Sequence, residues 1–107
     1  MTLTSKLQTF GNAMAQIPGE VYHYWRPKKK PPYTVWQEDS GQSFAADNQL
    51  AEQAASGTLD YFTKKEYDPV VDQIQGVLNG LPVHWHLNSV QYEENTGIIH
   101  YEWTWVW

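Results

Sequence analysis

Four side chains near the C-terminal end of the chain could bind a metal ion. His84 and His86 lie two residues apart, so on a strand they share one face, and a hairpin would bring His100 and Glu102 onto the neighbouring strand. Three imidazole nitrogens and one carboxylate are ligands that suit Zn²⁺. The register of the hairpin therefore decides whether these side chains meet.

The expected register separates the histidines. A turn centred near Thr96 pairs Val90 with His100 and leaves His86 several residues away. The chain has no cysteine and no helical pair of histidines that would support a metal centre. We therefore expect the histidines to occupy the polar face of a sheet, with no metal ligand among them.

Catalytic motifs are missing from the sequence. The carboxylates fall mostly in expected loops, in turns and on the surface of a helix, and no nucleophile has an adjacent base. There is no Gly-x-Ser-x-Gly elbow, no phosphate-binding glycine loop and no His-Glu-x-x-His pair. The sequence predicts a protein that is not an enzyme, with no catalytic residue, no cofactor-binding residue and no cofactor.

Three tryptophans alternate along the last predicted strand, at positions Trp103, Trp105 and Trp107. Exposed rings in such a row could stack on sugars or nucleobases. The same face also carries Ile99 and Tyr101, which favours packing in the core and against a neighbouring subunit. We expect the three tryptophans to be interface aromatics, with a ligand-stacking face as the alternative.

A basic, proline-rich loop follows the first predicted strand. Residues 26–32 carry Arg26, Lys28, Lys29 and Lys30 together with three prolines, which exclude a regular strand. In an acidic chain, such a protrusion suits an acidic surface on another protein or copy better than a phosphate backbone. We take these four residues as candidate contacts.

A second candidate contact segment is turn-rich. Residues 39–48 contain one apolar residue with a large side chain, Phe44, in polar surroundings, and we add Phe44 and Asp47 to the candidate interaction residues. The following residues 49–56 are rich in alanine and could be helical by propensity. The extended character of the next residues favours a strand instead, and Gly57 would then kink one long strand.

The most informative stretch runs from Thr58 to Gly80 and reads as a strand followed by a helix. Asp68 can accept a hydrogen bond from the first helical amides, and Pro69 suits the first turn. We expect Asn79-Gly80 to stop the helix in a left-handed conformation. The apolar stripe of this helix consists of Val70, Val71, Ile74, Val77 and Leu78.

The remaining elements follow from periodicity. Residues 2–16 form a helix that ends at Pro18-Gly19, and the strands 21–25 and 33–38 should pair as neighbours across a hairpin loop. Residues 83–92 and 98–107 form a second hairpin, with a bulge near 88–89 and a turn at 95–97. The prediction is one α+β domain over residues 1–107, in the order α-β-β-β-α-β-β, with two helices on one face of an antiparallel or mixed sheet.

Composition restricts the function. The 107 residues carry a net charge of −5 and a pI of about 5.2, which argues against a general nucleic-acid binder. The absence of cysteine excludes a disulfide-stabilised secreted scaffold and thiol catalysis. No signal peptide and no membrane-spanning run of apolar residues is found, so we expect synthesis and folding in a cytoplasm and no membrane partner.

From Val21 to Trp107 the chain resembles the small tail-completion, or tail-terminator, proteins of long-tailed phages and prophages of Gram-positive bacteria. Four short signatures carry the resemblance: PPYTVW at 31–36, SFAADN at 43–48, LDYFTKK at 59–65 and DPVVDQI at 68–74. An aromatic C-terminal strand completes them. The alanine-rich residues 51–56 and the many tryptophans in the last strand depart from the family pattern.

The resemblance implies a structural role without catalysis. Such proteins form a ring, typically of six copies, that stops polymerisation of the tail tube and presents a surface to the head connector. By position, the loops 26–32 and 39–48 would make the contacts, with at most transient contact to DNA in the lumen. The expected location is the virion tail, and the host cytoplasm during assembly. A neck or head–tail adaptor, a small ligand-binding module and a histidine-based hydrolase or metalloenzyme are the alternatives.

Overall fold

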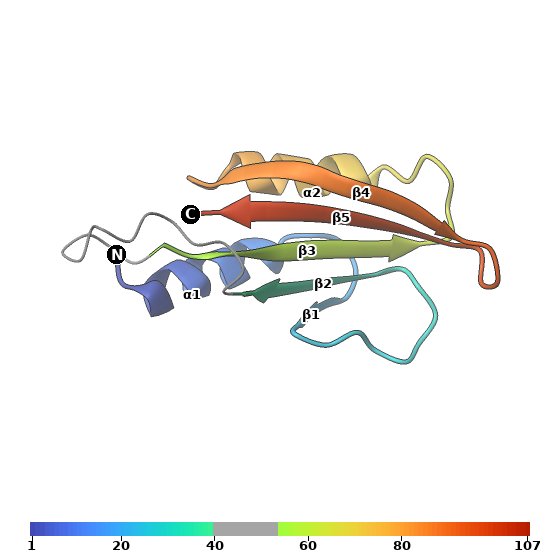
Figure 1. Ribbon diagram of the computed structural model, residues 1–107, viewed down its shortest axis with the longest axis horizontal. Helices are drawn as coiled ribbons and strands as arrows, with labels where there is room; N and C mark the ends of the chain where they lie inside the picture. Colours follow the sequence, from blue (N-terminus) through green and yellow to red (C-terminus); the bar gives the residue numbers. More distant parts are fainter. Residues whose placement is uncertain (40–53) are drawn as a thin grey trace.

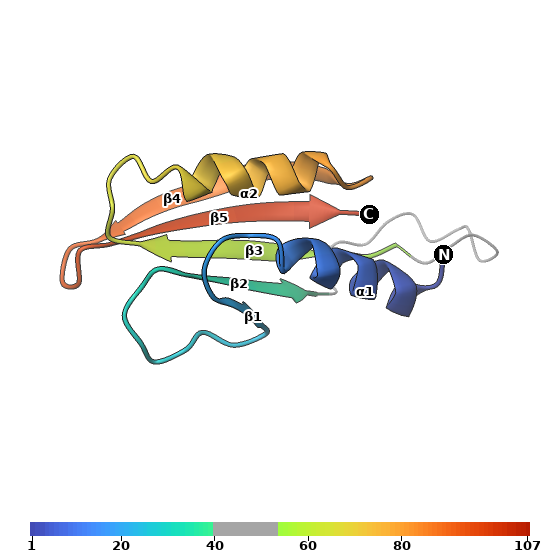
Figure 2. The same ribbon diagram turned by 180° about the vertical axis from the view of Figure 1, so that it is seen from behind.

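The computed structural model describes residues 1–39 and 54–107 as an α+β fold with two helices and one five-stranded mixed sheet. The predicted fold class and the order α-β-β-β-α-β-β are confirmed. Both helices lie on the same face of the sheet, behind it in Figure 1 and in front of it in Figure 2. The elements are α1 (Leu3–Met14), β1 (Val21–His23), β2 (Tyr33–Glu38), β3 (Ser56–Thr63), α2 (Val70–Asn79), β4 (His84–Glu93) and β5 (Ile98–Val106).

The strand order is β1-β2-β3-β5-β4, and one neighbouring pair differs from the prediction. β1 and β2 do lie side by side, but they run parallel, with Val21 opposite Thr34 and His23 opposite Trp36. The predicted hairpin between them is therefore wrong. Tyr24 has a φ of 84°, which turns the chain out of the strand early, and residues 24–32 carry it back to the starting end.

Helix α1 packs its apolar side on the centre of the sheet. Thr2 caps the helix, because its hydroxyl accepts a hydrogen bond from the Ser5 amide at 3.1 Å. The Phe10 ring stacks on Trp105, with 4.0 Å between the ring centres, and lies 5.2 Å from Trp36. This aromatic contact joins the helix to β2 and β5 and forms the middle of the core.

Helix α2 begins as the sequence predicts but ends differently. The Val70 amide donates to Asp68 Oδ1 at 3.0 Å, and Ile74 and Leu78 are fully buried against the sheet. The left-handed stop is wrong, because Gly80 has a φ of −81° and its amide donates to Val77 and Gly76 in a right-handed turn. The helix therefore ends without the conformation that requires glycine.

The start of β3 explains Gly57. A Cβ atom at this position would lie 1.9 Å from the Gln37 carbonyl oxygen and 2.8 Å from the Trp105 ring, so close approach of β2 and β5 excludes any side chain. Just before the strand, Ala55 and Trp107 exchange backbone hydrogen bonds of 3.2 and 2.7 Å. This agrees with an extended chain at 54–56, while residues 49–53 of the predicted strand lie outside the described residues.

The β4–β5 hairpin has the predicted bulge. The register shifts between Leu87 and Ser89, and Gly97 adopts a φ of 75° in the turn. The predicted opposition of Val90 and His100 is off by one, because Val90 lies opposite Tyr101 and Gln91 opposite His100. Across residues 1–39 and 54–107, no helix has the length and apolar character needed to cross a bilayer.

Candidate functional site

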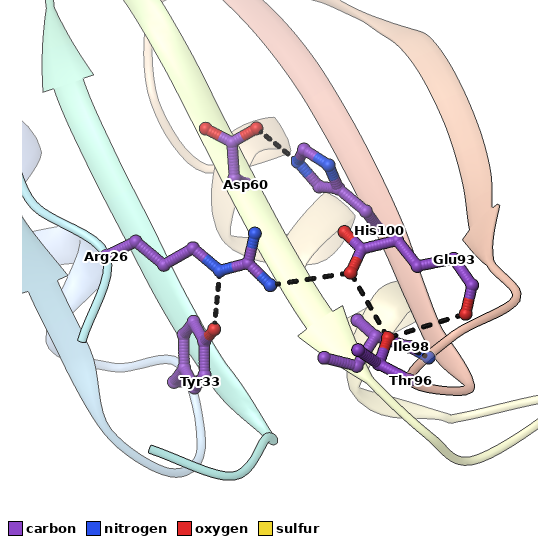
Figure 3. Close-up of polar contacts among 7 residues, drawn as sticks. All are labelled: Arg26, Tyr33, Asp60, Glu93, Thr96, Ile98 and His100. Carbon is purple, nitrogen blue, oxygen red and sulfur yellow. Dashed lines mark hydrogen bonds and ion pairs between the residues drawn. The ribbon is translucent and has the colours of Figure 1, made fainter. Parts of the chain in front are cut away.

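A second apolar cluster lies on the face of the sheet that the helices leave open. The cluster is small, and each of its members is at most 7% exposed: Tyr33, Val35, Phe62 and Ile98. The connection 24–32, which contains the predicted basic loop, folds towards this cluster and places Arg26 on it (Figure 3). The helix-free face is thus covered locally by the basic loop.

Arg26 fixes the start of the basic loop. Its Nε donates to the Tyr33 hydroxyl at 2.7 Å, and one terminal nitrogen lies 3.7 Å from Glu93 Oε1 (Figure 3). Its guanidinium carbon lies 4.2 Å above the centre of the Phe62 ring. The hydrogen bond to Tyr33 raises the pKa of Arg26 above its usual value. One side chain therefore contacts β2, β3 and the β4–β5 hairpin.

Lys29 holds the middle of the loop. Its ammonium group pairs with both carboxylate oxygens of Glu20, which precedes β1, and the distance to Oε2 is 2.6 Å. The hydrogen bond from Lys29 lowers the pKa of the Glu20 carboxyl. The pair is exposed, so it contributes less to stability than to the position of the loop.

The other two basic residues of the loop have no such partner among residues 1–39 and 54–107. Lys28 and Lys30 are exposed, and neither makes a hydrogen bond or ion pair with any residue of the ranges 1–39 and 54–107. Of the four predicted basic contacts, Arg26 and Lys29 hold the loop, and Lys28 and Lys30 remain available at its surface.

A histidine–carboxylate pair lies next to Phe62. His100 Nε2 is 2.7 Å from Asp60 Oδ1 (Figure 3). The imidazole also stacks on the Phe62 ring with 4.2 Å between centres. These two contacts with β3 fix the His100 side chain on the helix-free face of the sheet. It belongs to the surface on which the basic loop rests, not to a cluster with the other C-terminal histidines.

His84 and His86 lie at the other end of the same face. They line a pocket of about 310 Å³ together with Asp39, Thr58 and Thr104, and the Thr104 hydroxyl lies 3.1 Å from the His86 ring nitrogens. The carboxylate of Glu102 accepts from the Asn88 amide at 2.7 Å. Among the described residues, no three His, Asp or Glu side chains are placed to bind one metal ion.

Sequence reasoning missed an aromatic stack at the β1 edge. The His23 ring lies between Trp36 at 3.6 Å and Tyr24 at 3.7 Å, nearly parallel to both. Glu38 accepts hydrogen bonds from His23, at 2.8 Å, and from the Tyr24 hydroxyl. Burial raises the pKa of the Glu38 carboxyl, but these hydrogen bonds outweigh it and leave the pKa below its usual value. The stack depends on the parallel pairing of β1 and β2, for which the sequence gives no signal.

The expectation of an aromatic interface has to be corrected for two of the three tryptophans. Trp103 and Trp105 are 0% and 1% exposed, and the Trp103 indole donates to Gln75 of α2 at 3.1 Å. The core of the chain itself therefore covers both rings and leaves no surface for a partner. Trp107 is only partly buried and keeps some exposed surface. Phe44 and Asp47 lie outside the described residues.

Exposed apolar side chains occur instead on β4, the last strand of the sheet. Leu87, Val90 and Tyr92 are 42%, 52% and 63% exposed, on the side of the sheet that carries the helices. They line an outer edge to which no other strand in the described ranges is paired. Neither the available models of protein families nor the curated proteins contain a match to this chain.

Proposed function

We propose that this protein is a structural subunit of a phage or prophage tail, a tail-terminator protein that caps the tail tube and joins it to the head connector. The observation that carries the proposal is that the basic loop is held in place and presents exposed positive charges. Arg26 and Lys29 hold the loop against the sheet, while Lys28 and Lys30 are exposed and have no partner among residues 1–39 and 54–107. Positive charges presented on a held loop suit contact with an acidic protein surface.

The fold supports the same proposal. The four short signatures that carry the resemblance to tail-completion proteins are spaced along a chain whose α-β-β-β-α-β-β order is also that of the structure. Two helices cover one face of the sheet, which leaves the basic loop, the rest of the helix-free face and the edges of the sheet to meet other molecules. We therefore place the contacts in the loop 26–32 and keep the sheet and helices as the scaffold.

A ring requires two different surfaces on each subunit. Head-to-tail contacts between unlike surfaces generate closed rings, whereas contacts between like surfaces generate dimers. The basic loop supplies one such surface, and acidic residues on a neighbouring copy or on the tail tube supply its counterpart in an acidic chain with a net charge of −5. We propose six copies in the ring, with only transient contact to DNA in its lumen.

The neck adaptor remains the second candidate, because a held basic loop suits a head-connector surface as well as a tube surface. The ligand-stacking module loses its basis, since Trp103 and Trp105 are buried in the core. The tail-terminator and neck-adaptor roles differ only in the protein that the basic loop would contact. They are separated by offering the protein the tail-tube protein and the head-connector protein in turn.

Co-sedimentation with assembled tail tubes tests the proposal. The wild-type protein should sediment with tubes in low salt and less in high salt, because the contact depends on charge. A double variant Lys28→Glu/Lys30→Glu should stay in the supernatant. The matched control Lys64→Glu/Lys65→Glu reverses two exposed lysines in the β3–α2 connection and should sediment as the wild type does. Equal binding by both variants would exclude the loop as the contact.

A further inference from the structure

Strand β4 leaves a long edge of the sheet open. It has ten residues and pairs with β5 on one side, and no strand from residues 1–39 or 54–107 pairs with the other side. Alternate residues along that edge direct their N–H and C=O groups outward. Many natural edge strands carry lysine, proline or other features that prevent pairing with a second chain, and β4 contains neither residue.

The bulge at Asn88 divides this edge. After the bulge, residues 89–93 form a regular segment opposite Ile98–Glu102. Val90 and Tyr92 lie on the helix side and are both more than half exposed, whereas Gln91 and Glu93 lie on the other side. The regular segment therefore presents free backbone groups together with two exposed apolar side chains.

We propose that a second copy of this chain pairs with β4 through residues 89–93, antiparallel, with the two-fold axis at Gln91. In this register Val90 lies opposite the partner's Tyr92, and Ser89 lies opposite the partner's Glu93. Pairs of β-branched and aromatic residues across antiparallel strands stabilise a sheet, and serine can donate to a carboxylate. Each pair occurs twice, because the axis relates the two copies.

Self-complementarity favours a second copy over an unrelated strand. The segment reads Ser-Val-Gln-Tyr-Glu, and reversing it about Gln91 matches apolar with apolar and polar with polar side chains on both faces. The two-fold axis stands perpendicular to the sheet, so the two sheets join into one and all helices lie on the same side. The opposite edge cannot substitute, because β1 has three residues and ends at the turn of Tyr24.

The contact does not rest on the proposed tail function. A two-fold contact closes as a dimer and cannot by itself build a ring, so ring contacts would use other surfaces, such as the basic loop. The net charge of −5 on each copy opposes association, and salt should therefore strengthen the dimer. Salt should weaken the charge-dependent binding to tail tubes, so the two proposals respond in opposite directions and fail separately.

Cysteine cross-linking tests the register. The chain has no cysteine, so a single substitution gives one reactive thiol. In the proposed register the two copies of residue 91 face each other with Cα atoms about 4.5–5.5 Å apart, within the range of a disulfide. Gln91→Cys should give disulfide dimers under mild oxidation. The control Leu87→Cys lies on the same edge before the bulge and should cross-link roughly tenfold more slowly, because its Cα atoms lie beyond disulfide reach.

Mass in solution tests the contact without a cross-link. The weight-average mass of the wild type should rise from 12.4 kDa towards twice that value as concentration increases. Val90→Lys should stay monomeric and Leu87→Lys should associate as the wild type does, with circular dichroism confirming that both are folded. A wild type that stays monomeric at every concentration, a Val90→Lys variant that still dimerises, or equal cross-linking at positions 87 and 91 would overturn the proposal.

Discussion

The guanidinium carbon of Arg26 lies 4.2 Å from the centre of the Phe62 ring. This contact places a charge from the β1–β2 connection over the middle strand of the sheet, where Tyr33 and Glu93 also bind it. Because the guanidinium is held over an aromatic ring and hydrogen-bonded at the same time, the Arg26 side chain loses most of its conformational freedom. The positions of Lys28 and Lys30 therefore depend on Arg26.

Removing the Arg26 side chain should release the basic loop. We expect Arg26→Ala to lower the free energy of unfolding by about 1–2 kcal/mol, through loss of the cation–π contact and of one hydrogen bond. Trypsin should also cleave the variant faster at the loop lysines, because the loop opens more often. Chemical denaturation and limited proteolysis measure the two effects. Lys28→Ala, which removes an exposed lysine from the same loop, should leave the unfolding free energy within about 0.5 kcal/mol of the wild type.

The Asp68 carboxylate should stabilise the fold at pH values above the ordinary pKa of aspartate. Burial raises the pKa of its carboxyl, but hydrogen bonds from the Val70 amide, from Tyr61 at 2.7 Å and from Thr63 at 2.8 Å leave it lower than usual. A carboxyl with a lowered folded pKa stabilises the fold above its unfolded pKa of about 3.9 and loses this contribution as the pH falls through the folded value.

The substitution Asp68→Asn should therefore lower the free energy of unfolding most at neutral pH. We expect a loss of about 2–3 kcal/mol at pH 7, because the amide nitrogen of asparagine faces donors that the carboxylate accepted. Below pH 4 the difference from the wild type should shrink. Urea denaturation at several pH values measures it, and Asp72→Asn, an exposed neighbour in the first turn of α2, serves as the control. A difference that stays constant from pH 7 to pH 3 would contradict this account.

Two glycine substitutions should act in opposite directions. Gly57→Ala places a Cβ 1.9 Å from the Gln37 carbonyl oxygen, so it should destabilise the fold by about 3 kcal/mol or more. Gly76 lies inside helix α2, and beyond the neighbouring helix backbone a Cβ there would meet no atom within 4 Å, so Gly76→Ala should stabilise the fold by about 0.5–1 kcal/mol. Thermal denaturation of the two variants compares them directly. A Gly57→Ala variant as stable as the wild type would contradict the close approach of β2 and β3 at this position.

Periodicity in the sequence was enough to predict the helices, the bulge and the order of the elements. The apolar residues of α2 recur at helical spacing, and those of β5 alternate as in a strand. The structure buries Ile74, Leu78, Trp103 and Trp105 on the faces that these patterns predict. Periodicity shows which face of an element is buried, but not which part of the chain or which partner covers that face. For this reason the pattern allowed a subunit interface for Trp103 and Trp105, whereas α1 and α2 cover both rings.

The direction of β1 relative to β2 could not be read from the sequence. A nine-residue connection with three prolines suits a wide hairpin and a parallel return equally well, and the choice depends on the left-handed conformation of Tyr24. Tyrosine seldom adopts this conformation, so its residue type gives no signal. The stack of Tyr24, His23 and Trp36 and its link to Glu38 follow from that unpredicted turn.

The length of tail tubes grown in the presence of the protein tests the central proposal most directly. Purified tail-tube protein is polymerised alone, with the wild type, with Lys28→Glu/Lys30→Glu and with Lys64→Glu/Lys65→Glu, and tube lengths and ends are recorded by electron microscopy. If the protein terminates tubes through its basic loop, the wild type and the Lys64/Lys65 variant should give short tubes with a ring at one end. The Lys28/Lys30 variant should give long, uncapped tubes. Tubes of the same length with and without the wild-type protein would contradict the proposal.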